Sequence, residues 1–233
     1  MVLGAGRGTR LGALGLTVPK VLVEVAGKPL LERQVEYLAS HGVHRVVVNA
    51  HHLGEAIEAW ARDYNGDAEV VVVQEPELLG TAGGVRNALD LLGDEPFYVL
   101  YGDVLVDHPL AALAAEHSHS AAVATVTVYE TDDVEGKGTV ETDAEGWVEA
   151  FREKEPGIPT PALVNAGLYL VEPDLLAGLP LGVERDFGHD VFPEALGRGV
   201  RIRAHRLAEP VIDMGTPEGL ARARDRAATA GRG

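Results

Sequence analysis

The chain has 233 residues, contains no cysteine and carries a formal net charge of −16. Its length fits one domain with a sizeable core, the missing cysteines exclude disulfide bonds, and the acidic balance disfavours a nucleic-acid partner. No apolar stretch approaches the roughly 20 residues of a membrane-spanning helix, and no signal peptide is visible. We therefore expect a cytoplasmic globular protein with no membrane partner.

Short apolar runs alternate with segments of helical periodicity, which is typical of an α/β fold with a mostly parallel central sheet. The expected strands lie at residues 2–3, 45–49, 69–74, 97–101, 122–129, 138–142, 147–153, 165–171 and 200–206, with a further short strand just before Asp213. The expected helices lie at residues 29–41, 53–64, 81–92, 109–117 and 217–228. Thr81 is the residue type that caps a helix at its first turn.

We interpret residues 1–233 as a single domain. The segment 132–161 is rich in acids, glycines and prolines, and we interpret it as a β-rich insertion rather than a linker. The sequence shows no internal repeat and no C-terminal β-helix.

A glycine-rich loop directly follows the first expected strand and reads Leu3-Gly-Ala-Gly-Arg-Gly-Thr-Arg-Leu11. Glycines let backbone N–H groups approach an anion closely. Arginine and lysine side chains add mobile positive charge for a polyphosphate. The candidate residues for this role are Gly4, Gly6, Gly8, Arg7, Arg10 and Lys20.

Two other kinds of phosphate loop fit less well. A Walker loop needs Gly-x-x-x-x-Gly-Lys-Ser/Thr, which residues 27–29 and 136–138 do not provide. A dinucleotide fingerprint must open a helix, but residues 11–20 contain two glycines and a proline, which disfavour one. Glu24 does fall near the spacing of the ribose-binding acid of that fingerprint. Lys20 follows a proline, and we expect it in an extended segment.

Two aspartates follow expected strands far apart in the sequence, Asp103 and Asp213. Ligands in α/β sheets bind at the C-terminal ends of strands, so both side chains can reach one site. Carboxylates are the oxygen donors that Mg²⁺ prefers. Alternatively, Asp103 caps a turn and Asp213 caps the last helix.

Further motifs accompany the loop in a fixed order, beginning with Pro19-Lys20 and Val25-Ala-Gly-Lys-Pro-Leu-Leu31. The rest of the series lies at residues 79–84, 101–103, 138–141, 151–154, 165–169, 186–193 and 212–217. Together these motifs resemble the sugar-1-phosphate nucleotidylyltransferases, also called NDP-sugar pyrophosphorylases. The resemblance spans nearly the whole chain, and its strength lies in the ordered series rather than in any single motif.

The resemblance implies a Rossmann-like three-layer nucleotidyltransferase fold in which the insertion 132–161 binds the sugar. It implies a Mg²⁺-dependent enzyme that takes a nucleoside triphosphate and a sugar 1-phosphate, with Asp103 and Asp213 as metal ligands. Arg10 would contact the β- and γ-phosphates, and Lys20 would contact the α-phosphate. The implied nucleotide contacts are Leu3, Gly4, Ala5, Gly6, Arg7, Gly8, Thr9, Gln74, Gly80 and Thr81.

The implied sugar-phosphate contacts are Gly138, Glu153, Lys154 and Asn165. Adjacent strand residues point to opposite faces, so Glu153 and Lys154 need a bend between them to share a site. Asp190 either shapes this pocket or caps a helix. Gly83 and Gly84 fall inside an expected helix, which a close-approaching ligand or a packing contact would explain.

The motifs look most like those of manno-configured transferases that use GTP with mannose or heptose 1-phosphate. Thymidylyl or uridylyl transfer to glucose 1-phosphate is the alternative. A non-catalytic nucleotide-sugar sensor is an alternative of another class, although such proteins lose metal or phosphate ligands. A homo-oligomer is compatible with the sequence. The paired histidines His51–His52 and His117–His119 lack a third regularly spaced ligand, so we expect structural or solvent-exposed roles for them.

Overall fold

The computed structural model describes residues 1–6 and 8–230, without the side chains of 13 and 226–230. The chain divides into two compact units, residues 1–78 with 100–107 and 211–233, and residues 79–99 with 108–210. Arg7, one of the expected phosphate contacts, lies outside the described residues.

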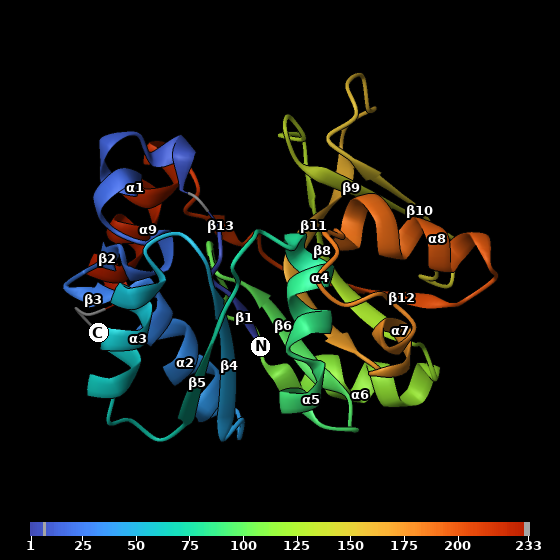
Figure 1. The fold of residues 1–233 in the computed structure, drawn as a ribbon. Helices are drawn as coiled ribbons and strands as arrows, with labels where there is room; N and C mark the ends of the chain where they lie inside the picture. The colour runs from blue at the N-terminus through green and yellow to red at the C-terminus, as the bar shows by residue number, and fades with distance from the viewer. Residues whose placement is uncertain (7, 231–233) are drawn as a thin grey trace. The chain divides into compact units, whose positions relative to one another are not determined.

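The first unit is built on parallel strands (Figure 1). β1 (Val2–Leu3) pairs in parallel with β4 (Arg45–Ala50) and with the end of β6 (Phe97–Tyr101). β5 (Glu69–Gln74) pairs in parallel with β4. Five consecutive residues of β4 are buried, as expected for a parallel strand with both faces covered. Parallel pairing brings the carboxyl ends of these strands to one edge.

The longer helices of this unit bury one apolar face each. In α2 (Leu30–Ser40) the buried side chains recur at helical spacing on Leu30, Leu31, Gln34, Val35 and Leu38. Burial of each of these leucines stabilises the folded state by roughly 1.5–3 kcal/mol. α3 (Gly54–Asp63) contacts β5.

The C-terminal helix α9 (Pro217–Ala230) belongs to the first unit. Its buried Leu220 and Ala223 join Leu11, Val23 and Met214 in one apolar cluster. The end of the chain therefore packs against residues that directly follow the glycine loop. Two small antiparallel pairs complete this unit, β2 (Glu24–Val25) with β3 (Lys28–Pro29), and β7 (Val104–Leu105) with β13 (Ile212–Asp213).

The second unit is mainly antiparallel. β11 (Ala162–Val171) pairs antiparallel with β8 (Ala124–Thr131) and with β9 (Gly138–Thr142). β10 (Val148–Glu153) pairs antiparallel with β9, and β12 (Ile202–Arg206) runs parallel to β8. The hairpin β9–β10 lies within the segment 132–161, where the sequence predicts a β-rich insertion.

The helices of the second unit are α4 (Gly80–Asn87), α5 (Leu89–Leu92), α6 (Leu110–Ser120), α7 (Asp174–Ala177), a π-helical turn η3 (Phe187–Val191) and α8 (Phe192–Gly197). Four aromatic side chains, Phe151, Tyr169, Phe187 and Phe192, pack with ring centroids between 5.2 and 5.5 Å apart. This cluster joins η3 and α8 to the strands β10 and β11.

The predicted fold class is confirmed, since helices accompany a parallel sheet as expected. The single-domain interpretation and the sugar-binding role of segment 132–161 stay predictions. Among the described residues, the structure contains no helix with the length and apolar character needed to span a membrane.

Three local predictions are wrong. The helix expected at 81–92 is two helices, α4 and α5, joined at Ala88. Thr81 does not cap it, because the cap position is Leu79 and no side chain bonds there. Lys20 is not extended but opens a 3-10 turn, η2 (Lys20–Leu22), whose cap position is Pro19.

The segment after the glycine loop is also more helical than we expected. Residues 11–20 are too rich in glycine and proline for a long helix, yet the five-residue helix α1 (Ala13–Thr17) forms between Gly12 and Val18. Before it lies another 3-10 turn, η1 (Thr9–Leu11). A single helical turn fits between these residues although a full helix does not.

Candidate active site

Asp103 sits just after the carboxyl end of β6, in a turn that is fixed on two sides. The N–H of Gly102 donates to the Leu3 carbonyl oxygen at 3.0 Å, and any Cβ at Gly102 would collide with that oxygen. The buried Gln34 of α2 donates its amide to the carbonyl oxygens of Tyr101 at 2.9 Å and Val104 at 2.7 Å. Asp103 is thus held by residues on both sides of it.

Two cations meet the Asp103 carboxylate. The ammonium group of Lys20 lies 2.5 Å from Oδ2 of Asp103, and a guanidinium nitrogen of Arg10 lies 3.9 Å from the same oxygen. The Lys20 side chain is mostly buried, at 12% exposure, whereas that of Arg10 is 58% exposed. Lys20 is therefore the more enclosed of the two cations, and Arg10 is the more accessible to solvent.

Asp213 reaches the same place through the β7–β13 pair. Asp213 is the register partner of Val104, the residue after Asp103, and the Met214 N–H donates to the Asp103 carbonyl oxygen at 2.8 Å. Oδ1 of Asp213 accepts the Gly215 N–H at 2.6 Å. The cap of α9 comes instead from the Thr216 hydroxyl, which accepts the Gly219 N–H at 3.1 Å.

Gly215 marks the point where these side chains converge. A Cβ added there would lie 2.7 Å from Oδ1 of Asp213, 2.7 Å from Nζ of Lys20 and 2.8 Å from Nη2 of Arg10. The structure thus brings together the four residues Arg10, Lys20, Asp103 and Asp213, which the sequence predicts as catalytic.

The glycine loop enters this site from β1. Gly8 has a φ of +64°, which favours glycine, and its carbonyl oxygen accepts the Leu11 N–H at 3.0 Å. Gly15 packs so closely on Gly8 that any Cβ at Gly15 would collide with this oxygen. Ala5 is buried, while Gly6 and Thr9 are exposed. The loop is compact around Gly8 and open at Gly6.

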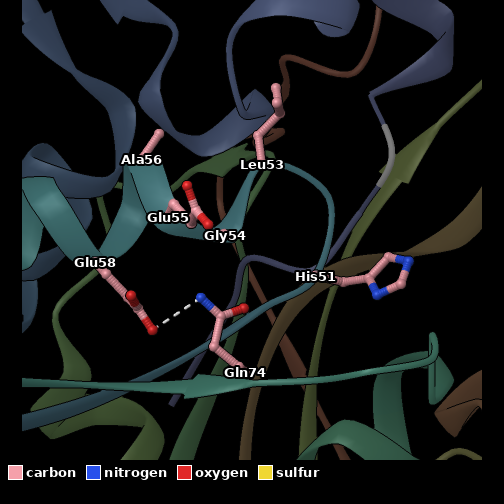
Figure 2. Close-up of a pocket in the computed structure, with 7 residues that line it drawn as sticks. All are labelled: His51, Leu53, Gly54, Glu55, Ala56, Glu58 and Gln74. Carbon is pink, nitrogen blue, oxygen red and sulfur yellow. Dashed lines mark hydrogen bonds between the residues drawn. The ribbon is translucent and has the colours of Figure 1, made fainter.

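Gln74, a predicted base contact, faces α3. Its amide donates to Oε1 of Glu58 at 2.9 Å, and the missing side chain of Gly54 makes room for it. The bond lies in a pocket of about 690 Å³. Figure 2 shows the bond among the lining residues, with the His51 ring directed away from Gln74. Figure 2 also shows Glu55 and Glu58 in the lining, and these acids favour a polar or cationic occupant over a phosphate.

The second unit holds the predicted sugar-phosphate residues. Glu153 is the register partner of Gly138, and a Cβ on Gly138 would lie 2.6 Å from Oε2 of Glu153. A Cβ on Gly188 would lie 2.8 Å from the same oxygen. Lys154 has a φ of +56°, and its ammonium group lies 3.0 Å from Oε1 of Glu153. This left-handed residue supplies the expected bend that lets both side chains share one face.

Asn165 lies on the strand next to β9, at an irregularity of β11. Its Oδ1 accepts the Gly167 N–H at 3.0 Å, and its Nδ2 donates to the Tyr169 hydroxyl at 2.6 Å. Asn165 therefore stabilises the irregular segment between Asn165 and Tyr169, where the pairing with β8 shifts.

Thr81 and Asp186 join two predicted motifs of the second unit. The Thr81 hydroxyl donates to Oδ2 of Asp186 at 2.8 Å and accepts the Phe187 N–H at 2.9 Å. Asp186, not Asp190, caps η3 through the N–H of Gly188. Asp190 instead accepts the Asp186 N–H, and this bond holds the pKa of the Asp190 carboxyl below its usual value.

Gly80 and Gly83 are required by packing within the second unit. Gly80 has a φ of +70°, and a Cβ there would lie 2.5 Å from the Arg185 carbonyl oxygen. A Cβ on Gly83 would collide with the Val183 carbonyl oxygen. The segment 183–185 is therefore the close neighbour that explains the glycine inside the helix.

The acidic pair Asp103 and Asp213 fits a magnesium ion by donor chemistry. Mg²⁺ is commonly held by one or two carboxylates and keeps water and phosphate oxygens as its other ligands. Within the part of the chain that the structure describes, no group of three or more His, Asp or Glu side chains is placed to hold a metal. His51 and His117 have structural partners instead, the Glu75 carbonyl oxygen and the Thr125 hydroxyl.

Comparison with known proteins identifies the family of this chain. The family described as nucleotidyl transferase matches residues 1–229. The chain belongs to the nucleotidyl transferase family. Its confirmed resemblance to sugar-1-phosphate nucleotidylyltransferases extends to individual members of that group.

The chain is 32% identical over 232 residues to a UTP–glucose-1-phosphate uridylyltransferase of Synechocystis sp., an alignment that covers 92% of this chain and 59% of the relative. It is 34% identical over 224 residues to a mannose-1-phosphate guanylyltransferase of Mycobacterium tuberculosis, covering 95% of this chain and 62% of the relative. The chain thus spans about three fifths of the length of these relatives. The crystal structure of HddC from Yersinia pseudotuberculosis complexed with GMP-PN has a TM-score of 0.84 and 26% identity, covering 97% of both chains.

Several residues that build these sites were not predicted from the sequence. They are Gln34, Asn49, Glu75, Gly102, Asp186, Gly188 and Gly215. Gly102, Gly188 and Gly215 each lie inside a predicted motif, so their position within two residues of a predicted acid was an available signal. The roles of Gln34, Asn49 and Glu75 depend on contacts between distant segments, which no local pattern reveals.

Proposed function

We propose that this protein transfers a nucleoside monophosphate from a nucleoside triphosphate to a sugar 1-phosphate, releasing pyrophosphate. The observation that carries the proposal is the convergence of Arg10, Lys20, Asp103 and Asp213 around Gly215. Two cations and two carboxylates at the end of a glycine loop suit a polyphosphate with a bound divalent cation.

The chemistry needs alignment and charge neutralisation more than a nucleophilic side chain. The sugar-phosphate oxygen is already ionised at neutral pH, so it attacks the α-phosphorus without a general base, and pyrophosphate leaves in line. Lys20 would neutralise the α-phosphate, and the exposed Arg10 would contact the departing β- and γ-phosphates. In the second unit, Lys154 would bind the sugar phosphate, and Glu153 would accept a hydrogen bond from a sugar hydroxyl.

Asp103 and Asp213 would hold Mg²⁺. When bound, the ion supplies Lewis-acid neutralisation of phosphate oxygens. The Lys20 ammonium group lies 2.5 Å from the Asp103 carboxylate, so this cation would stand beside the metal.

We infer that the substrates are GTP and a manno-configured sugar 1-phosphate, of the mannose or heptose type. The guanylyltransferase relative and the neighbouring structure with a guanine nucleotide support this pair. The uridylyltransferase relative favours the second candidate, uridylyl or thymidylyl transfer to glucose 1-phosphate. A non-catalytic sensor is disfavoured because the predicted metal and phosphate residues Arg10, Lys20, Asp103, Lys154 and Asp213 are all retained.

Pyrophosphate release with a panel of nucleoside triphosphates and sugar 1-phosphates, with and without Mg²⁺, tests the proposal. We expect turnover with Mg²⁺ and GTP, and a loss of at least 100-fold in both Asp103→Ala and Asp213→Ala, since each removes a carboxylate that would hold the Mg²⁺ ion. Circular dichroism would check that both variants remain folded. Full activity in either variant would refute its role as a metal ligand, and turnover only with dTTP or UTP would move the substrate assignment to the second candidate.

A further inference from the structure

The glycine loop begins at a residue whose N–H is already used. The N–H of Gly4 donates to Oδ1 of Asn49 at 2.9 Å, and this bond is buried. Gly4 also lies so close to β4 that a Cβ on it would be 2.7 Å from the Asn49 carbonyl oxygen. The phosphate contacts of the loop would therefore fall to residues after Gly4.

Asn49 is itself oriented by a buried acid. Its Nδ2 donates to Oε1 of Glu75 at 2.7 Å, and the side chains of Asn49 and Glu75 belong to residues only 2% and 3% exposed. The amide can take only one orientation, because the Gly4 N–H needs an acceptor and the Glu75 carboxyl oxygen needs a donor. Glu75 follows β5, and its own N–H donates to the Ala50 carbonyl oxygen at 2.7 Å.

The chain at Leu3–Gly4 is thus held from two strands. On one side the Gly102 N–H binds the Leu3 carbonyl oxygen, next to Asp103, and on the other side Asn49 binds the Gly4 N–H. A peptide fixed at both its carbonyl and the following amide has little freedom to rotate. The direction in which the loop leaves β1 is set by these contacts.

We propose that the buried pair Asn49 and Glu75 is a positioning device that aims the glycine loop at the triphosphate. This inference rests on the proposed function, since it concerns the same phosphate site. Both residues are almost fully buried, so neither would touch the substrate. Glu75 fixes the Asn49 amide, Asn49 fixes the Gly4 peptide, and the Gly4 peptide sets the direction of the loop N–H groups that follow.

Reversing the polarity of the hydrogen bond tests the device. In Asn49→Asp, two carboxyl groups face each other in a buried place, and repulsion displaces the introduced side chain or forces it to take up a proton. In Asn49→Asp with Glu75→Gln, the new glutamine amide donates to the introduced carboxylate, which still accepts the Gly4 N–H. We expect the KM for the triphosphate to rise at least tenfold in the single variant and to return to within threefold of wild type in the double variant.

A change in the KM for the triphosphate alone distinguishes misplacement of the glycine loop from a general disruption of the fold. We expect the KM for the sugar 1-phosphate to stay within twofold in every folded variant, because the loop is changed and the sugar residues are not. Asn87→Asp, a matched change at an exposed position of α4, should leave both constants unchanged. A single variant with an unchanged KM for the triphosphate would overturn the proposal, as would a double variant no better than the single one.

Two measurements keep the inference testable on its own. If Asn49→Asp does not fold, Glu75→Met removes the acceptor while keeping the length of the side chain, and it should raise the same KM about fivefold. Hydrogen exchange of the Gly4 amide needs no substrate. We expect exchange to be at least tenfold faster in Glu75→Met than in wild type. Equal exchange rates would show that Glu75 does not position the Gly4 peptide through Asn49. A wild type that turns over no substrate pair would instead count against the proposed function.

Discussion

Individual residues in this protein matter through the space they leave as much as through the groups they carry. Gly215 has no side chain, yet it determines whether Arg10, Lys20 and Asp213 can approach one another. Gly138 and Gly188 do the same beside the Glu153 carboxylate. A glycine that borders several charged side chains is therefore as informative about a site as the charges themselves.

Gly215→Ala tests this at the residue scale. The new methyl group would meet three flexible charged side chains at 2.7–2.8 Å, so the side chains should move and the backbone should stay. We expect at least a tenfold loss of kcat with a melting temperature within about 3 °C of wild type. Gly178→Ala is the control, because a Cβ there meets open space and Gly178 has a helical φ of −83°. Unchanged kcat in Gly215→Ala would show that the convergence is not needed for turnover.

At the scale of elements, the predicted site residues lie in short irregular segments. Longer regular helices and strands keep these segments in place. Lys20 opens a 3-10 turn, Asp103 lies between β6 and β7, and Lys154 follows β10 in a left-handed conformation. Gln34 of α2 fixes the Asp103 turn through two carbonyl groups. The same division applies to α4, whose start is fixed by the segment 183–185.

Gly83→Ala tests that packing. Alanine is favoured over glycine in a helix by up to about 1 kcal/mol, but the added Cβ would collide with the Val183 carbonyl oxygen. A backbone oxygen cannot move aside cheaply, so we expect a net loss of about 1–3 kcal/mol in the free energy of unfolding. Gly197→Ala, in the last position of α8 with open space around it, should be neutral or slightly stabilising. Urea denaturation of both variants would reveal the contrast, and equal stabilities would argue against the collision.

At the scale of the whole molecule, the formal net charge is −16, yet two basic side chains of the first unit, Arg10 and Lys20, lie together beside Asp103. In the second unit, Glu116 of α6 binds Arg203 at 2.6 Å and His205 at 2.6 Å, which ties α6 to β12. Partial burial acts to raise the pKa of the Glu116 carboxyl, but hydrogen bonds from His205 and Arg203 outweigh it, so the pKa lies below its usual value of 4.5.

This lowered pKa predicts how stability depends on pH. A carboxyl group with a depressed pKa in the folded state stabilises the protein above pH 4.5, and that stabilisation disappears as the pH falls through the folded-state value. We expect Glu116→Gln to lose about 1 kcal/mol at pH 7, a modest figure because the pair is partly exposed, and its difference from wild type to shrink as the pH falls below 4.5. Urea unfolding at several pH values measures this. The exposed Glu135→Gln should show no such trend, and a pH-independent loss in Glu116→Gln would contradict the assignment.

The sequence by itself determined the family, the α/β architecture and most element positions. The strands 69–74, 97–101 and 138–142 form with the predicted bounds, and the first two are short apolar runs of the kind that predicts a strand. The four catalytic candidates come from motifs whose chemistry is local. Predictions failed where local chemistry has two outcomes: Thr81 could cap a helix or bind a distant acid, and it binds Asp186.

Only the tertiary structure decided which distant segments meet. Asp103 and Asp213 are brought together because 100–107 and 211–233 both return to the first unit and pair as β7 and β13. Tertiary packing of distant segments also buries Glu75 beside Asn49. The same packing leaves no room for a side chain at Gly102 or Gly215. A linear pattern records periodicity and residue type, whereas burial and close approach arise between chain segments that lie far apart in the sequence.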